Sequence, residues 1–180
     1  VEIKNANVSF FPRGLQNFFI NLKSVTILKS NLKEIRKEDL KPLIQLELLD
    51  LSSNNLQVIE PDLFKFNSRI KFIYLHNNKI SHIDPKVFDE LVVQLQRLVL
   101  VGNVCPFNFV NDENDFVDPA INQELISRIR GGACKNDAKL AEFLAQGTTT
   151  TTTKKPTTIL PCGEFSEGLN GNFLKFLIFS

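Results

Sequence analysis

The chain has 180 residues, a formal net charge of +1 and 43% hydrophobic residues, which suits one soluble domain with or without a tail. The 21 Lys and Arg against 20 Asp and Glu leave almost no basic surplus, so we expect no nucleic-acid partner. No apolar run approaches 18 residues, so we also expect no integral membrane span. Because the chain lacks Met and begins at Val1 without a charged-then-apolar leader, we expect a processed protein or a fragment.

Regularly spaced apolar residues followed by a polar residue recur along the first part of the chain. The pattern is L-x-x-L-x-L-x-x-N-x-L-x-x-I, and its copies begin at residues 22, 46, 70 and 95, which lie 24, 24 and 25 residues apart. A partial copy precedes them, with Val1, Ile3, Ala6 and Val8. Internal spacings of 3 and 2 fit neither a helix nor an alternating strand throughout, so the fixed period favours a solenoid over an amphipathic helical repeat.

This pattern resembles the leucine-rich repeat family over roughly residues 1–110. The resemblance implies an α/β solenoid, a right-handed β-α superhelix with a parallel sheet on its concave side. The L-x-L part of each unit would be a strand that pairs with the next unit, with alternate side chains pointing into the core. Leu40, Phe64 and Phe88 occupy one equivalent position and would stack on the convex side.

The polar residue that ends each short strand is predicted to bond the backbone of neighbouring turns. Asn54, Asn78 and Asn103 would form this ladder. Ser30 is a weaker substitute and Ala6 carries no side-chain bonding group, so we expect the ladder to be least regular at the N-terminal end.

A partner would bind the concave face, at the exposed positions of x-L-x-L-x, as is general in this family. These positions hold more apolar and aromatic residues than a solvated sheet requires, and such patches mark interfaces. The predicted binding residues are Leu28, Leu48, Asp50, Phe72, Tyr74, His76, Arg97 and Val99. High β-propensity alone, or cover by the cap and tail, remains an alternative reason for their composition.

After the repeats, residues 105–146 resemble the cysteine-containing C-terminal caps of extracellular leucine-rich repeat proteins. A Cys105–Cys134 disulfide is expected, although such caps commonly hold four cysteines, and two free thiols in a cytosolic protein are the alternative. Helical spacing predicts one helix over residues 119–130 and a second from Asn136 or Asp137 to Gln146, ended by Gly147.

The remaining features lie at the two ends of the chain. Val1 and Ile3 would form an exposed edge strand at a cut or blunted end, and Asn7 begins the one glycosylation sequon, Asn-Val-Ser. The predicted organisation is repeats at 1–104, cap at 105–146, Thr-rich linker at 147–160 and a short tail at 161–180 that holds the unpaired Cys162. The Thr run is typical of an O-glycosylated stalk or a flexible linker.

Function is predicted to be protein recognition without catalysis. No nucleophile-elbow, Walker, Rossmann or zinc signature is present, and His76 and His82 should point to different faces, so we expect no enzyme, cofactor or metal. The 24-residue period resembles that of Toll-like receptor ectodomains and short secreted insect proteins, which implies an extracellular module with a protein ligand or receptor. An intracellular scaffold and a structural or matrix protein, dimeric through Cys162 or the N-terminal edge, remain alternatives.

Overall fold

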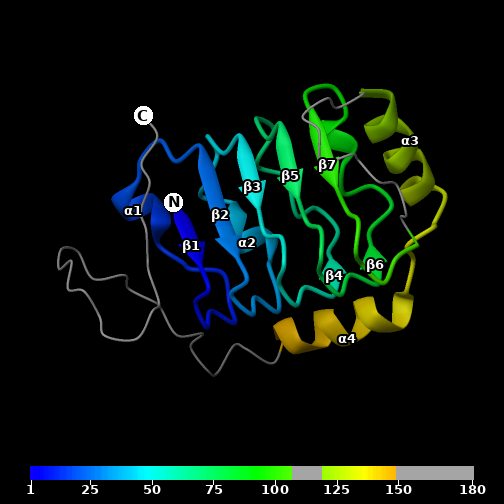
Figure 1. The fold of residues 1–180 in the computed structure, drawn as a ribbon, viewed down its shortest axis with the longest axis horizontal. Coiled ribbons are helices and arrows are strands. Elements are labelled where there is room, and N and C mark those ends of the chain that lie inside the picture. The colour runs from blue at the N-terminus through cyan, green and yellow to red at the C-terminus, as the bar shows by residue number, and fades with distance from the viewer. Residues whose placement is uncertain (107–118, 149–180) are drawn as a thin grey trace.

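The structure, a computed structural model, describes residues 1–106 and 119–148. One parallel sheet contains five strands in the order β1 (Glu2–Lys4), β2 (Ser24–Leu28), β3 (Leu48–Asp50), β5 (Phe72–Tyr74) and β7 (Arg97–Val99). The strands stand side by side in chain order, as in a solenoid whose turns each add one strand (Figure 1). This is the predicted leucine-rich repeat solenoid with a parallel sheet.

The register of the sheet equals the period of the sequence. Ser24 lies opposite Leu48, Leu48 opposite Phe72, and Phe72 opposite Arg97. These pairs are 24, 24 and 25 residues apart, so residues at one repeat position form a row across the sheet. Since side chains alternate along a strand, every second row faces the core and the others face outward.

The inward rows form a continuous apolar core. Val25, Ile27, Leu49, Ile73 and Leu98 are completely buried, with a relative exposure of 0%. Burying one such aliphatic side chain contributes about 1.5–3 kcal/mol, so each turn is stabilised mainly by stacking on its neighbours.

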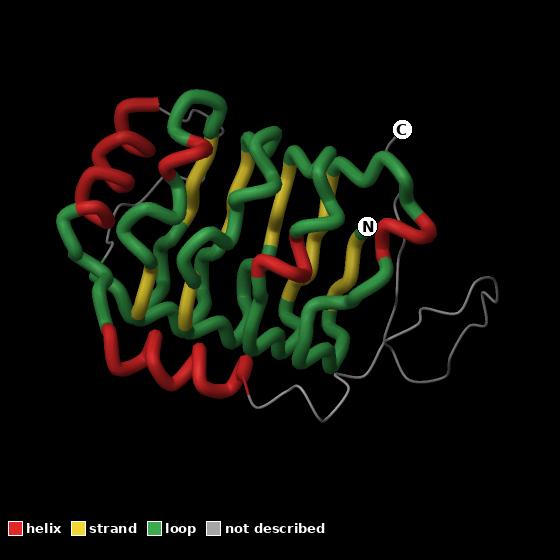
Figure 2. The backbone as a smooth tube through the Cα atoms, turned by 180° about the vertical axis from the view of Figure 1, so that it is seen from behind, coloured by secondary structure: helices red, strands yellow, loops and turns green. Residues whose placement is uncertain are grey.

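The return path of each turn is short and mostly irregular, as the view from behind shows (Figure 2). It contains the helices α1 (Leu15–Phe18) and α2 (Lys37–Leu40), the 3-10 helix η1 (Asp89–Leu91), and a two-stranded sheet of β4 (Val58–Ile59) and β6 (His82–Ile83). Phe64 and Phe88 stack here with ring centroids 5.7 Å apart, and Leu40 is fully buried, so the predicted apolar column is present.

Buried asparagines join successive turns at the end of the strands. The Asn54 Nδ2 group donates to the carbonyls of Ile27 and Leu51, at 2.6 and 3.0 Å, and its Oδ1 accepts from the Ser30 N–H at 3.0 Å. Asn78 and Asn103 repeat this arrangement one and two turns later. Each amide thereby pairs backbone groups that the tight bend would leave unsatisfied.

The first turn has a simpler hydrogen-bonding pattern, because Ala6 occupies the position that Ser30 and Asn54 hold in the next two turns. The backbone N–H of Ala6 donates to the Ser30 hydroxyl at 3.3 Å, and that hydroxyl donates to the Leu28 carbonyl at 2.7 Å. β1 is the terminal strand of the sheet, as predicted for Val1 and Ile3, and the side chains of these two residues face the core. Val1 and Ile3 are 7% and 2% exposed because the turn that follows folds under them and completes the core.

The opposite end of the sheet is closed by helix α3 (Pro119–Arg130), in place of a further strand. The Asn122 side chain accepts from the Leu98 N–H at 3.1 Å and donates to the Gln96 carbonyl at 2.7 Å, so it pairs the free edge of β7 as a strand would. Cys105 and Cys134 form a disulfide, with Cα atoms 5.2 Å apart, that ties this cap to the last repeat.

Helix α4 (Asp137–Thr148) turns back and runs along the edge of the solenoid at which β4 and β6 lie (Figure 1). Both predicted cap helices are confirmed, but Gly147 does not end the second one. Instead, Gly147 lies against Arg36, where an added Cβ would be 2.7 Å from the guanidinium Nη1. Any side chain at this position would require the Arg36 guanidinium to shift.

Several predicted features fall on residues 107–118 and 149–180, outside the described residues. They are the Thr-rich linker and the tail with Cys162. Within the described part, no helix is long and apolar enough to cross a membrane.

Candidate protein-binding surface

The outward rows of the five-stranded sheet bring most of the predicted binding residues together. One row contains Leu48, Phe72 and Arg97, and the next contains Asp50, Tyr74 and Val99. Leu28 lies at the end of β2, in register with Lys4 of β1. Because neighbouring strands are about 4.8 Å apart, residues of one row are close enough to touch a single partner side chain.

The aromatic part of this surface lies on β5 and β7. The guanidinium carbon of Arg97 is 5.7 Å from the centroid of the Tyr74 ring, a cation–π arrangement. The Tyr74 and His76 rings meet edge to face, with centroids 6.5 Å apart. Phe72, Tyr74, His76 and Arg97 are all half-buried, so each keeps an accessible face. We call these four residues the concave cluster.

His76 is uncharged at neutral pH. Burial lowers its pKa below the ordinary value of 6.5, the Asp50 carboxylate opposes that shift, and the Arg97 cation reinforces it. Within residues 1–106 and 119–148, the Nδ1 atom of His76 and the Nε atom of Arg97 are buried and make no hydrogen bond. Polar atoms in this state cost about 1–3 kcal/mol each.

Asp50 is already engaged at the margin of the cluster. Its Oδ1 accepts from the backbone N–H of Ser52 at 3.0 Å and from the Ser52 hydroxyl at 2.7 Å. Ser52 is in turn buried, with 4% exposure. Asp50 therefore presents one oxygen to a partner while the other holds the strand end in place.

Val99 is the predicted binding residue whose expected exposure is wrong. Its relative exposure is 8%, in the same range as the core. Its register partner on the neighbouring strand β5 is Tyr74. Val99 therefore offers little accessible surface to a partner.

The N-terminal part of the surface is charged. Its charged residues were not among the predicted binding residues, because the first repeat is only a partial copy of the pattern. Glu2 and Lys4 flank the inward Ile3 on β1 and form an ion pair. Strand alternation in the partial copy is the signal that would have placed them on this face. The surface thus changes from charged at β1 to aromatic at β5 and β7.

The two histidines lie in different environments. His76 belongs to the concave cluster, whereas His82 is 1% exposed in β6, where its Nδ1 accepts from the Asn136 N–H at 2.9 Å. Among the described residues, no group of three His, Cys, Asp or Glu side chains is placed to hold a metal ion.

Comparisons with known proteins agree with this architecture. A protein-family model described as leucine rich repeat matches residues 20–80 and 44–104. Over 106 residues the chain is 33% identical to the human (Homo sapiens) "Leucine-rich repeats and immunoglobulin-like domains protein 3", covering 57% of this chain and 9% of that protein. Over 96 residues it is 30% identical to chicken (Gallus gallus) "Toll-like receptor 2 type-1", covering 53% and 12%.

The solved structure of the "APL1 leucine-rich repeat domain" is similar with a TM-score of 0.43 and 18% identity, over 57% of this chain and 34% of that one. The chain thus spans only 9% and 12% of the two curated relatives. The matched repeats coincide with the strands whose register equals the sequence period. Residues 20–104 of this chain thus match the leucine-rich repeat family.

Proposed function

We propose that this chain is a non-catalytic, extracellular recognition module that binds a partner protein through its concave face. The observation that carries the proposal is the concave cluster, in which Arg97 and His76 each pack against Tyr74 and each of the three keeps an accessible face. Aromatic and Arg side chains in a partly buried cluster supply most of the binding energy in typical protein interfaces.

The position of the cluster on a rigid sheet supports the same proposal. Each strand of the sheet is fixed by its register with its neighbours and by the buried Asn54 and Asn78 side chains. A partner therefore meets side chains whose backbone does not need to be ordered on binding, which lowers the entropic cost of association.

An extracellular location is supported by the Cys105–Cys134 disulfide, since structural disulfides persist in oxidising compartments. The names of two relatives, an immunoglobulin-like domain protein and a Toll-like receptor, are in keeping with it. Asn7 is exposed and accepts a bond from the Asn31 amide at 3.3 Å, so its sequon is accessible to a glycosylating enzyme.

The proposal is tested by affinity capture from a secreted or cell-surface fraction with the full chain as bait. The Tyr74→Ala/Arg97→Ala variant should lose the captured protein, because both interface anchors are removed. The matched control is Lys65→Ala on the convex side, which should retain it. Capture that is equal for both variants would place the interface elsewhere.

A further inference from the structure

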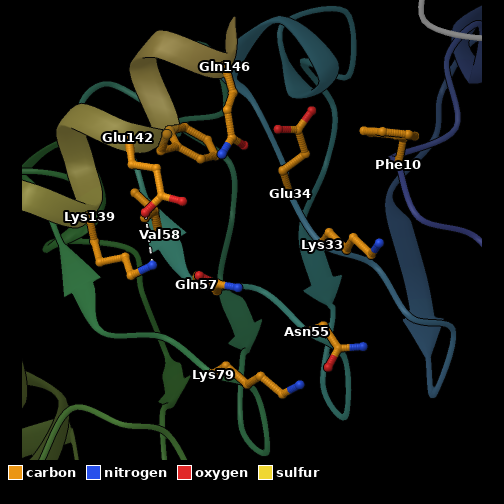
Figure 3. A pocket seen from close by; sticks show the side chains of 11 residues that line it. Phe10, Lys33, Glu34, Asn55, Gln57, Val58, Lys79, Lys139, Glu142 and Gln146 are labelled. Carbon is orange, nitrogen blue, oxygen red and sulfur yellow. Dashed lines mark hydrogen bonds and ion pairs between the residues drawn. The ribbon is translucent and has the colours of Figure 1, made fainter.

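A cleft lies between helix α4 and the turns that follow the strands (Figure 3). Its volume is about 440 Å³. One wall is a single face of α4, with Lys139, Glu142, Phe143 and Gln146 at helical spacing. The floor consists of loop residues from four successive turns, and includes Phe10, Lys33, Asn55, Gln57 and Lys79.

The cleft has an excess of positive charge. Lys139 pairs with Glu142 at 2.9 Å, and Glu34 pairs with Arg36 at 3.1 Å, so both carboxylates of the lining are bound to cations. Lys33 and Lys79 are exposed on the floor, and neither makes an ion pair with another residue of the described ranges 1–106 and 119–148. Two ammonium groups therefore face the cleft without a counter-charge.

Between the two lysines the floor carries side-chain amides. The Asn55 Nδ2 group donates to Asn31 at 3.0 Å, which leaves its Oδ1 as an acceptor. Gln57 is exposed and offers both a donor and an acceptor. A side-chain amide matches the donor and acceptor of a peptide group, so this part of the floor suits a peptide backbone. Phe10, which is 40% exposed, adds apolar surface at one end.

We propose that this cleft binds an extended acidic segment of a partner protein. Its carboxylates bond Lys33 and Lys79, and its backbone bonds the Asn55 and Gln57 amides. The site lies beside α4 rather than on the five-stranded sheet, so it is separate from the concave face.

The spacing of the turns also determines how far apart the acidic residues of the bound segment stand. Turns of a parallel solenoid are about 4.8 Å apart, so Lys33 and Lys79, two turns apart, are separated by roughly 10 Å along the floor. An extended chain rises about 3.3 Å per residue, so the two acidic residues stand about three positions apart. Phe10 pairs across one turn with Glu34, the residue after Lys33, which favours an aromatic residue shortly before the first acidic one. The motif is Phe-Glu-x-x-Glu.

The test is a nuclear magnetic resonance titration of the isotope-labelled full chain with the peptide Ac-Phe-Glu-Ser-Ser-Glu-NH2. The control peptide replaces both Glu residues by Gln. We expect the amide signals of Asn55, Gln57 and Lys139 to shift, and we expect weaker binding at higher salt because the pairs are exposed. The Lys33→Gln/Lys79→Gln variant should bind about tenfold more weakly, as exposed ion pairs contribute up to about fivefold each.

The matched control variant is Lys41→Gln/Lys65→Gln, which removes the same charge from exposed positions outside the cleft and should bind as the wild type does. Equal binding of the Glu and Gln peptides, or shifts confined to Tyr74 and His76, would overturn the proposal. So would binding of a heparin tetrasaccharide in place of the peptide. These results do not depend on whether a partner binds the concave face, because concave-face binding is tested separately with variants of Tyr74 and Arg97.

Discussion

Replacing Asn54 by Ala should remove the most heavily bonded side chain of the ladder. Its Oδ1 accepts from the N–H groups of Ser30 and Leu32, at 3.0 and 3.1 Å, and its Nδ2 donates to carbonyls that include those of Ile27 and Leu51. The substitution leaves the two N–H groups buried without a partner, at about 1–3 kcal/mol each. After partial relaxation, we expect the free energy of unfolding to fall by about 3–4 kcal/mol.

The assay is urea unfolding followed by far-ultraviolet circular dichroism, because the chain has no Trp and a single Tyr. Asn55→Ala is the matched control, since the neighbouring Asn55 makes a single exposed side-chain bond, to Asn31 at 3.0 Å. That variant should change the free energy of unfolding by less than about 0.5 kcal/mol. An Asn54→Ala variant within about 1 kcal/mol of the wild type would refute the reasoning, as would an equal loss for Asn55→Ala.

Three further predictions concern the cap and the first turn. Replacing Cys105 and Cys134 by Ser should lower the free energy of unfolding by about 3–4 kcal/mol in urea titrations, because the disulfide closes a loop of 29 residues and so restricts the unfolded chain. Free thiols at these positions, detected by non-reducing peptide mapping, would contradict the pairing. Burial lowers the pKa of His82 below 6.5, and its neutral form accepts the Asn136 N–H, so this stability is present above about pH 6.5 and is lost as the pH falls. Thermal melts from pH 7.5 to 5 should show that loss, and His82→Gln should flatten it; an unchanged profile would argue against the role of His82. Expression in a secretory eukaryotic host should yield a mass that glycosidase treatment reduces, and Asn7→Gln should abolish the difference; an identical mass for both proteins would show that the sequon is unused.

The repeat position of a residue is enough to predict its place in the sheet, because the strand register of a parallel solenoid equals the period of its sequence. Residues that are 24 positions apart, such as Leu48 and Phe72, occupy the same repeat position and lie in the same row of the sheet. The same logic places Asn54 and Asn78 in equivalent surroundings. Local and nearest-turn interactions dominate in such a fold, so a one-dimensional pattern contains most of the information.

Features that depend on contacts between distant segments could not be predicted in this way. Asn122 pairs the edge of β7 from within a helix, and Arg36 donates to the Phe143 carbonyl, which is 107 residues away. The return of α4 along the solenoid also creates the cleft, which no local pattern indicated. Burial of Val99 likewise did not follow from its outward repeat position.

Hydroxyl-radical footprinting of the chain, with and without the protein captured by affinity, tests the recognition surface most directly. The method reports the solvent exposure of individual side chains. Binding on the concave face should decrease the modification of Phe72, Tyr74 and His76 and leave Phe18 and Phe66, exposed on the convex side, unchanged. Protection of Phe18 and Phe66 with unaltered modification of Tyr74 would contradict concave-face recognition.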